Sequence, residues 1–148
     1  MSDSPPFFDS CYLVRLYLEE EGFQAVRDVA QSNTSIAAAW HAQAEVVAAF
    51  HRAFRERHLS LRSFQSLLDQ FHRDSQNGLF DWLLLTQTVQ KRLESEFRNI
   101  PVTTFLRAAD ALHLACAAEN GFTAVYSNDL HLLASAGLFG LQGINVIH

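Results

Sequence analysis

The chain has 148 residues, enough for one domain with a sizeable core, and 49% of them are hydrophobic while 18% are charged. This balance excludes a disordered chain, and six glycines and three prolines exclude a collagen-like or low-complexity one. Sixteen Asp and Glu residues against eleven Lys and Arg residues give a formal net charge of −5. Such a chain does not attract nucleic acid through its overall charge.

The sequence carries no signal for secretion or membrane insertion. The uncharged stretch 31–44 contains several polar residues, and no segment reaches the roughly 20 apolar residues that a membrane helix needs. The N-terminus is acidic and lacks the basic region of a signal peptide. Two cysteines, Cys11 and Cys116, are too few for a disulfide framework or a zinc site. We therefore expect a soluble, cytoplasmic protein that does not bind a membrane.

Hydrophobic periodicity divides the chain into short apolar runs of strand character and longer stretches with apolar residues at helical spacing. The predicted elements are, in chain order, a strand at 7–8, helices at 11–20 and 23–31, a strand at 36–39, helices at 41–57 and 61–71, a strand at 79–85, helices at 86–97 and 106–119, a strand at 122–126, a helix at 129–136 and a strand at 144–147. Ser60 is a predicted N-cap, and Asn120 with Gly121 ends a helix. This alternation predicts an α/β sandwich with a mainly parallel, five-stranded sheet, folded as one domain over 1–148 after a loose lead-in at 1–6.

Four acidic residues occupy positions where a carboxylate is costly or where ligands bind. Glu45 and Asp110 lie in helices that are apolar on almost every side, so each needs a partner, a proton or a metal. Asp9 and Asp129 each follow an apolar strand and open a helix, which is where open α/β sheets bind ligands. Like charges from four elements that meet at one cleft require cations there. Ligation by carboxylate oxygens favours Mg²⁺ or Mn²⁺ over zinc.

Each of these acids also has a purely structural interpretation. The two acids at strand ends can be helix N-caps. Asp110 can pair with Arg107 one turn earlier. Glu45 can meet His41 at i, i+4 or face solvent. We interpret His113, three residues after Asp110, as a core histidine because its helix is so apolar.

Four stretches carry a family resemblance: FDSCYLVRLYLEE at 8–20, AEV at 44–46, RAADALHLA at 107–115 and VYSNDL at 125–130. In this order they resemble the successive signatures of PIN-domain ribonucleases, and among these the VapC-type toxins of bacterial and archaeal toxin-antitoxin pairs. The resemblance runs from Phe7 to the C-terminus, with 58–104 similar only in pattern. Cys11 departs from the Ser, Thr or Ala usual at its position.

The resemblance implies a three-layer α/β/α fold and a metal-dependent endoribonuclease. Asp9, Glu45, Asp110 and Asp129 correspond to the acidic, metal-binding residues of the family, with Asp9 and Asp110 as the principal ligands. Ser127 corresponds to the small hydroxyl residue before the last acid. The implied reaction is hydrolysis of RNA phosphodiester bonds by a water that Mg²⁺ or Mn²⁺ activates. The implied partners are RNA, a small antitoxin protein and a second copy of the chain.

Polar and basic residues around these acids complete the prediction. Side chains interpreted as donors to a carboxylate or phosphate are Ser10, Ser127 and Asn128. The segment 51–62 collects four arginines and two histidines against one glutamate, so we expect Arg52 and Arg55 to guide the RNA backbone, with a solvated helix end as the alternative. Arg15 is a weaker candidate for RNA binding, and a surface charge is its alternative interpretation.

Three alternative functions stay open at this stage. The first is a non-catalytic, PIN-like binding module whose acids are caps and salt bridges, and the second is a PIN nuclease without an antitoxin. The third is a phosphoryl-transfer enzyme with Asp9 as nucleophile, although Cys11 stands where that motif commonly carries a second acid. If the four acids bind metal, the remaining formal charge is −1, and the acidic balance no longer opposes a nucleic-acid partner.

Overall fold

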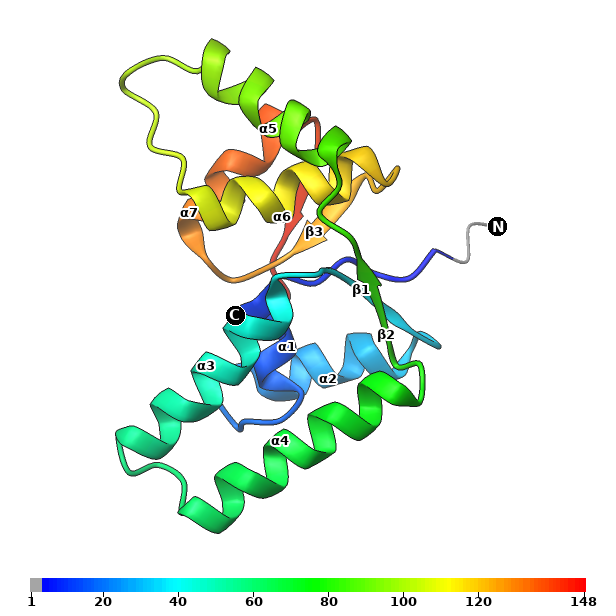
Figure 1. Cartoon of the computed structure of the whole chain (residues 1–148), viewed down its shortest axis with the longest axis vertical. Helices are drawn as coiled ribbons and strands as arrows, with labels where there is room; N and C mark the ends of the chain where they lie inside the picture. The colour runs from blue at the N-terminus through cyan, green and yellow to red at the C-terminus, as the bar shows by residue number, and fades with distance from the viewer. Residues whose placement is uncertain (1–3) are drawn as a thin grey trace.

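The computed structural model describes residues 4–148, which form seven α-helices, one 3-10 helix and four short strands (Figure 1). The elements are α1 (Ser10–Arg15), α2 (Phe23–Gln31), β1 (Ile36–Ala39), α3 (Ala42–Arg55), α4 (Leu61–Gln76), β2 (Phe80–Leu83), α5 (Gln87–Asn99), α6 (Ala108–Glu119), β3 (Ala124–Tyr126), α7 (Leu130–Ser135), η1 (Ala136–Phe139) and β4 (Gln142–Ile144). Every predicted helix is present, and Ser60 caps α4 as expected. The first helix is shorter than predicted because tight i, i+3 turns end it at Leu16 and Tyr17. Across the described part of the chain, no helix has the length and apolarity needed to cross a membrane.

The strands form two parallel pairs, β1 with β2 and β3 with β4. The segment between them, predicted as a strand at 7–8, makes a single bridge on each side, from Phe7 to Ala37 and from Phe8 to Tyr126. The predicted five-stranded sheet is therefore not confirmed. The chain before Phe7 is Pro5 and Pro6, which have no N–H to donate to a ladder, and the helix α1 starts directly after Asp9.

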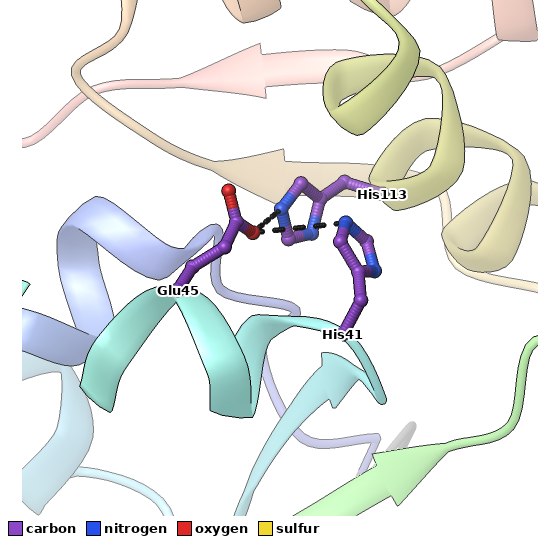
Figure 2. Close-up of side chains that lie close together, drawn as sticks. All are labelled: His41, Glu45 and His113. Atoms are coloured by element: carbon purple, nitrogen blue, oxygen red, sulfur yellow. Dashed lines mark hydrogen bonds and ion pairs between the residues drawn. The ribbon is translucent and has the colours of Figure 1, made fainter. Parts of the chain in front are cut away.

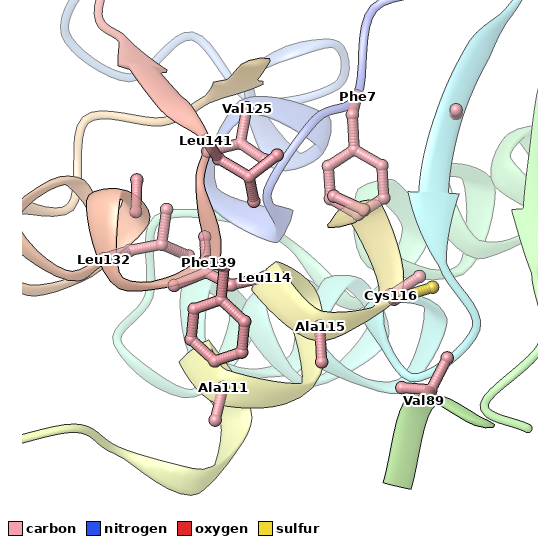
Figure 3. Close-up of a cluster of buried hydrophobic side chains, with 14 of the residues drawn as sticks. Phe7, Val89, Ala111, Leu114, Ala115, Cys116, Val125, Leu132, Phe139 and Leu141 are labelled. Carbon is pink, nitrogen blue, oxygen red and sulfur yellow. The ribbon is translucent and has the colours of Figure 1, made fainter. Parts of the chain in front are cut away.

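Helices cover both sides of these strands, with α1 to α4 on one side and α5 to α7 on the other (Figure 1). Phe7 and Ala37 belong to the buried cluster under α5, α6 and α7, part of which Figure 3 shows. Their neighbours Phe8 and Ala38 belong to the cluster formed with α1 to α4. Alternate residues of an extended chain point to opposite faces, so this central layer supplies both cores and produces the predicted three-layer α/β arrangement.

The C-terminal segment packs against α1 instead of extending the sheet. The hydroxyl of Tyr12 donates to Asn145 Oδ1 at 3.0 Å and accepts the backbone N–H of Val146 at 2.8 Å. The strand predicted at 144–147 consequently begins two residues earlier and ends at Ile144, because the backbone beyond it bonds to side chains. Part of the lead-in predicted as loose is also fixed, since the carbonyl of Pro6 accepts the N–H of Ala37.

Two glycines with left-handed backbone provide a matched test of this packing. Gly22 and Gly78 have φ of +79° and +82°, but a Cβ on Gly22 would clash with Ile147, whereas a Cβ on Gly78 would meet nothing within 4 Å. We expect Gly78→Ala to lower the free energy of unfolding by about 1 kcal/mol through backbone strain alone. Gly22→Ala should cost a further ~1–3 kcal/mol because it also displaces the C-terminal segment. Urea denaturation measures both, and equal losses would contradict the packing.

Candidate active site

The carboxyl ends of the central strands meet at Asp9 and Ser127. Asp9 is the N-cap of α1, is 5% exposed, and accepts hydrogen bonds from Ser10 N–H at 2.6 Å and from the Cys11 thiol at 3.3 Å. Ser127 is fully buried, donates to Asp9 Oδ2 at 2.8 Å and accepts the backbone N–H of Asp129 at 2.9 Å. The serine therefore connects the first and the last of the four predicted acids.

A histidine lies between two of the acids, as Figure 2 shows for one of them. His113 Nε2 is 2.6 Å from Glu45 Oε1 and 3.4 Å from Asp9 Oδ1, and the His113 side chain is 1% exposed. Burial alone would lower the pKa of His113, but the hydrogen bond to Glu45 and the charge of Asp9 raise it above its usual value. Burial likewise opposes the ionised form of Glu45, and the hydrogen bond and charge of His113 hold its pKa below the usual range.

His113 is buried, as its interpretation as a core histidine requires, but its ring contacts the acidic site. The sequence signal for this position was its spacing of three residues from Asp110, which places both side chains on one face of α6. The i, i+4 spacing predicts His41 only as a partner of Glu45, and the structure places its Nε2 3.6 Å from Glu45 Oε1. Its ring also packs 4.0 Å, centroid to centroid, from that of His113.

An arginine connects the other two acids. Arg107 donates from Nε to Asp110 Oδ2 at 2.7 Å and from a terminal nitrogen to Asp129 Oδ2 at 2.6 Å. Burial raises the pKa of Asp110 in spite of Arg107, and the charges of Asp129 and Asp9 add to the rise. Burial would also raise the pKa of Asp129, but the hydrogen bond from Arg107 keeps it below its usual value. Because the charge of Asp9 contributes to the raised pKa of Asp110, the pair Asp110 and Asp129 and the pair Asp9 and Glu45 lie close enough to form one site.

The acids act as helix caps and ion-pair partners, and they also lie close together in one site. Asp9 caps α1 and Asp129 caps α7, and Asp110 pairs with Arg107 as the i, i+3 spacing suggested. A capping carboxylate keeps a second oxygen for another partner, so capping does not exclude ligand binding. The capping and pairing contacts therefore fix the orientation of the carboxylates.

The donor set fits a hard divalent cation. Asp9 and Asp110 are 5% and 7% exposed, which makes uncompensated charge there costly. Arg107 contacts Asp110 and Asp129, and His113 contacts Glu45 and Asp9. Oxygen ligands from carboxylates suit Mg²⁺ and Mn²⁺, so the acids are able to hold such an ion when it takes the place of these side-chain contacts.

The basic residues predicted to bind RNA differ in their surroundings. Arg15 is 8% exposed and donates to the carbonyls of Glu21 and Cys11, so it is neither a surface charge nor a group open to a polymer. Asn128 accepts a hydrogen bond from Arg15 at 3.5 Å and supports that arginine. Arg52 and Arg55 are exposed at the end of α3, where Arg52 pairs with Glu56 at 3.0 Å.

The family model of the PIN domain matches residues 7–137. The chain belongs to the PIN-domain family. No curated protein sequence matches it. The resemblance in the four sequence stretches and the strand-end position of the acids agree with this membership.

Solved structures of VapBC and other toxin-antitoxin proteins have a similar fold. VapBC2 from Rickettsia felis bound to a promoter DNA fragment is similar with a TM-score of 0.67 and 13% identity, covering 96% of this chain and 98% of that one. A toxin-antitoxin complex from Klebsiella pneumoniae gives 0.61 and 14%, covering 97% and 98%. VapC20 from Mycobacterium tuberculosis, a toxin that cleaves the sarcin-ricin loop, gives 0.64 and 12%, covering 92% and 98%. At such low identities the likeness shows the fold.

Ser127 allows a test of how the acids are held in place. Ser127→Ala removes the donor to Asp9 and leaves the N–H of Asp129 without its acceptor, in a fully buried position. We expect the free energy of unfolding to fall by about 1–3 kcal/mol. Ser66→Ala, at an exposed position of α4, should change it by less than about 0.5 kcal/mol. Chemical denaturation of both variants measures the difference, and similar values would show that Ser127 does not hold the site.

Proposed function

We propose that this protein is a metal-dependent endoribonuclease that hydrolyses RNA phosphodiester bonds in the cytoplasm, and that it is the VapC-type toxin of a toxin-antitoxin pair. The observation that carries the proposal is the pattern of four acids, from four elements, around the carboxyl ends of the strands in a PIN-domain chain. Every acidic position of the family pattern is retained. The structural neighbour VapC20 from Mycobacterium tuberculosis is a toxin that cleaves the sarcin-ricin loop, which supports the same activity.

In this mechanism the acids hold and orient the metal ion. Asp9 and Asp110, the most buried of the four, would be its principal ligands, and the more exposed Glu45 and Asp129 would complete the set. A bound Mg²⁺ or Mn²⁺ supplies a water made nucleophilic near neutral pH and neutralises charge on the scissile phosphate. Ser127 orients Asp9 by donating a hydrogen bond to its Oδ2.

Arg107 has a second role when the acids bind metal. Its guanidinium has five N–H donors, and its side chain is 38% exposed, so it is able to turn from Asp110 and Asp129 toward an incoming phosphate. An arginine beside the scissile group adds charge stabilisation that does not depend on pH. Arg52 and Arg55, exposed at the end of α3, extend this positive surface for the RNA backbone.

The proposed partners are a small antitoxin and a second copy of the chain. Both structural neighbours described as complexes include toxin and antitoxin components, which supports the antitoxin. Trp40 and Leu84 are exposed by 51% and 61% at the neighbouring ends of β1 and β2, where Trp40 N–H donates to the carbonyl of Leu83. Such an apolar patch favours burial against another protein surface. We assign Trp40 and Leu84 to the interface between two copies of the chain.

The nuclease activity is tested with purified variants and a single-stranded RNA probe. Asp110→Asn should lower the rate of Mg²⁺-dependent cleavage at least ~100-fold, because it removes a charged ligand at the reacting centre. Chelation of the metal by EDTA should stop cleavage by the native protein. Asp81→Asn, an exposed acid of β2, is the matched control and should cleave normally. Cleavage by Asp110→Asn at the native rate would exclude this active site.

The antitoxin is tested by co-expression with the product of a short reading frame adjacent to the gene. The two proteins should purify together, and the complex should cleave the RNA probe at least about tenfold more slowly than the free chain, because the antitoxin covers the acidic site. If the active nuclease has no such partner, the alternative of an unpaired PIN nuclease is correct. A chain that binds RNA without cutting it would favour the non-catalytic binding module.

A further inference from the structure

We propose that His41, Glu45 and His113 form a binding site for a divalent transition-metal ion of the zinc and cobalt class, with two imidazole nitrogens and one carboxylate oxygen as ligands. This site differs in chemistry from the all-carboxylate set proposed to hold Mg²⁺. It shares only Glu45 with that set, so it extends the proposed function to a second kind of metal.

The three side chains come from two helices that face each other (Figure 2). His41 precedes α3 as its N-cap residue, and Glu45 follows one turn later, a spacing of i, i+4 that places two ligands on one side of a helix. His113 comes from α6. The donor atoms of all three lie within 4.8 Å of one another. Ligands of a tetrahedral zinc ion are roughly 3.3 Å apart, as follows from bond lengths near 2.0–2.1 Å.

His113 Nε2 lies 2.6 Å from Glu45 Oε1, and His41 Nε2 lies 3.6 Å from the same oxygen and 3.2 Å from the carbonyl oxygen of Ala109. An ion bound by His41 Nε2 would replace this contact with Ala109. His113 is 1% exposed and His41 18%, so the nitrogens are largely removed from water. Nδ1 of each ring is buried and has no hydrogen-bond partner among the described residues. Neither ring is therefore fixed from its Nδ1 side, and small ring rotations are enough to bring three donors around an ion.

Imidazole nitrogen determines which ions this site prefers. Neutral imidazole binds zinc, cobalt, nickel and copper strongly, whereas Mg²⁺ prefers oxygen ligands and keeps its waters. The ion would replace the proton between His113 and Glu45, and that proton would be released to solvent. Glu45 is 35% exposed, which opens a path for the ion from solution.

Because Glu45 belongs to both sets of ligands, an ion bound at the histidine site would regulate RNA cleavage. This consequence rests on the proposed function. An ion of the zinc class on Glu45 withdraws this carboxylate from the Mg²⁺ set. Zinc should therefore inhibit Mg²⁺-dependent RNA cleavage, and the inhibition should require His41. A carboxylate-only site would show no such dependence on a histidine.

Direct metal binding tests the proposal without RNA. Co²⁺ is added to the whole purified chain, and the visible d–d absorption of the protein-bound ion is followed together with the heat of binding. We expect one bound Co²⁺ in the native protein and an affinity at least about tenfold lower in His41→Gln, which loses a ligand. His41 makes no side-chain cap bond to α3, and glutamine keeps an N–H donor for the carbonyl of Ala109, so this variant should keep the fold. His72→Gln, at an exposed position of α4, is the control and should bind as the native protein does.

Asp110→Asn separates this site from the carboxylate set. The proposal predicts that the variant binds Co²⁺ with the native visible spectrum while its Mg²⁺-dependent cleavage is lost. Co²⁺ binding that survives His41→Gln but disappears in Asp110→Asn would overturn the proposal and assign the ion to the carboxylates. Cleavage and Co²⁺ absorption are measured separately. Absence of RNA cleavage by the native protein would contradict the nuclease assignment, whereas Co²⁺ binding that does not depend on His41 would contradict the histidine site.

Discussion

The structure depends on compensating the charge of four carboxylates that lie close together near the carboxyl ends of the parallel strands. Asp9 and Asp110 are nearly buried, and Asp110 is destabilised in its ionised form by burial and by its acidic neighbours. Arg107 bridges Asp110 and Asp129, and His113 bridges Glu45 and Asp9. Removing either cation would leave buried negative charge without a partner. The four acids therefore form two pairs, one held by Arg107 and the other by His113. These pairs define where a metal ion and a phosphate can enter.

The short central segment explains how the acids reach this edge. Phe7 and Phe8 make one bridge each, yet their rings extend into opposite cores, so two residues fix the chain firmly. The abrupt change from extended chain to helix at Asp9 places its side chain at the strand end, where it accepts the backbone N–H of Ser10. A longer strand here would carry the acid away from Ser127. The missing fifth strand is thus part of what positions the site.

Local patterns in the sequence predicted much of this structure. Helical periodicity located all seven helices, and carboxylates in apolar helices or after strands identified the four acids that the fold brings together. The environment of Arg15 was not predictable, because its burial comes from carbonyls that approach only in the folded chain. His113 was assigned to the core from the apolarity of its helix, since its contact with Glu45 joins residues 68 positions apart. Periodicity reports which face of a helix is buried, but it does not identify the element that covers that face.

Helix α6 contributes both kinds of cation and one of the principal acids. Arg107, Asp110 and His113 follow one another at intervals of three residues, which places them along one face of the helix and its first turn. The two cations differ in how they give way to metal. Arginine keeps its proton at any physiological pH, so Arg107 must move aside and remains available as a positive charge near the phosphate. Histidine can lose its proton and become a ligand itself. In the two proposed metal sites, this helix supplies Asp110 to the hard ion and His113 to the ion that prefers nitrogen ligands, and both sites would use Glu45.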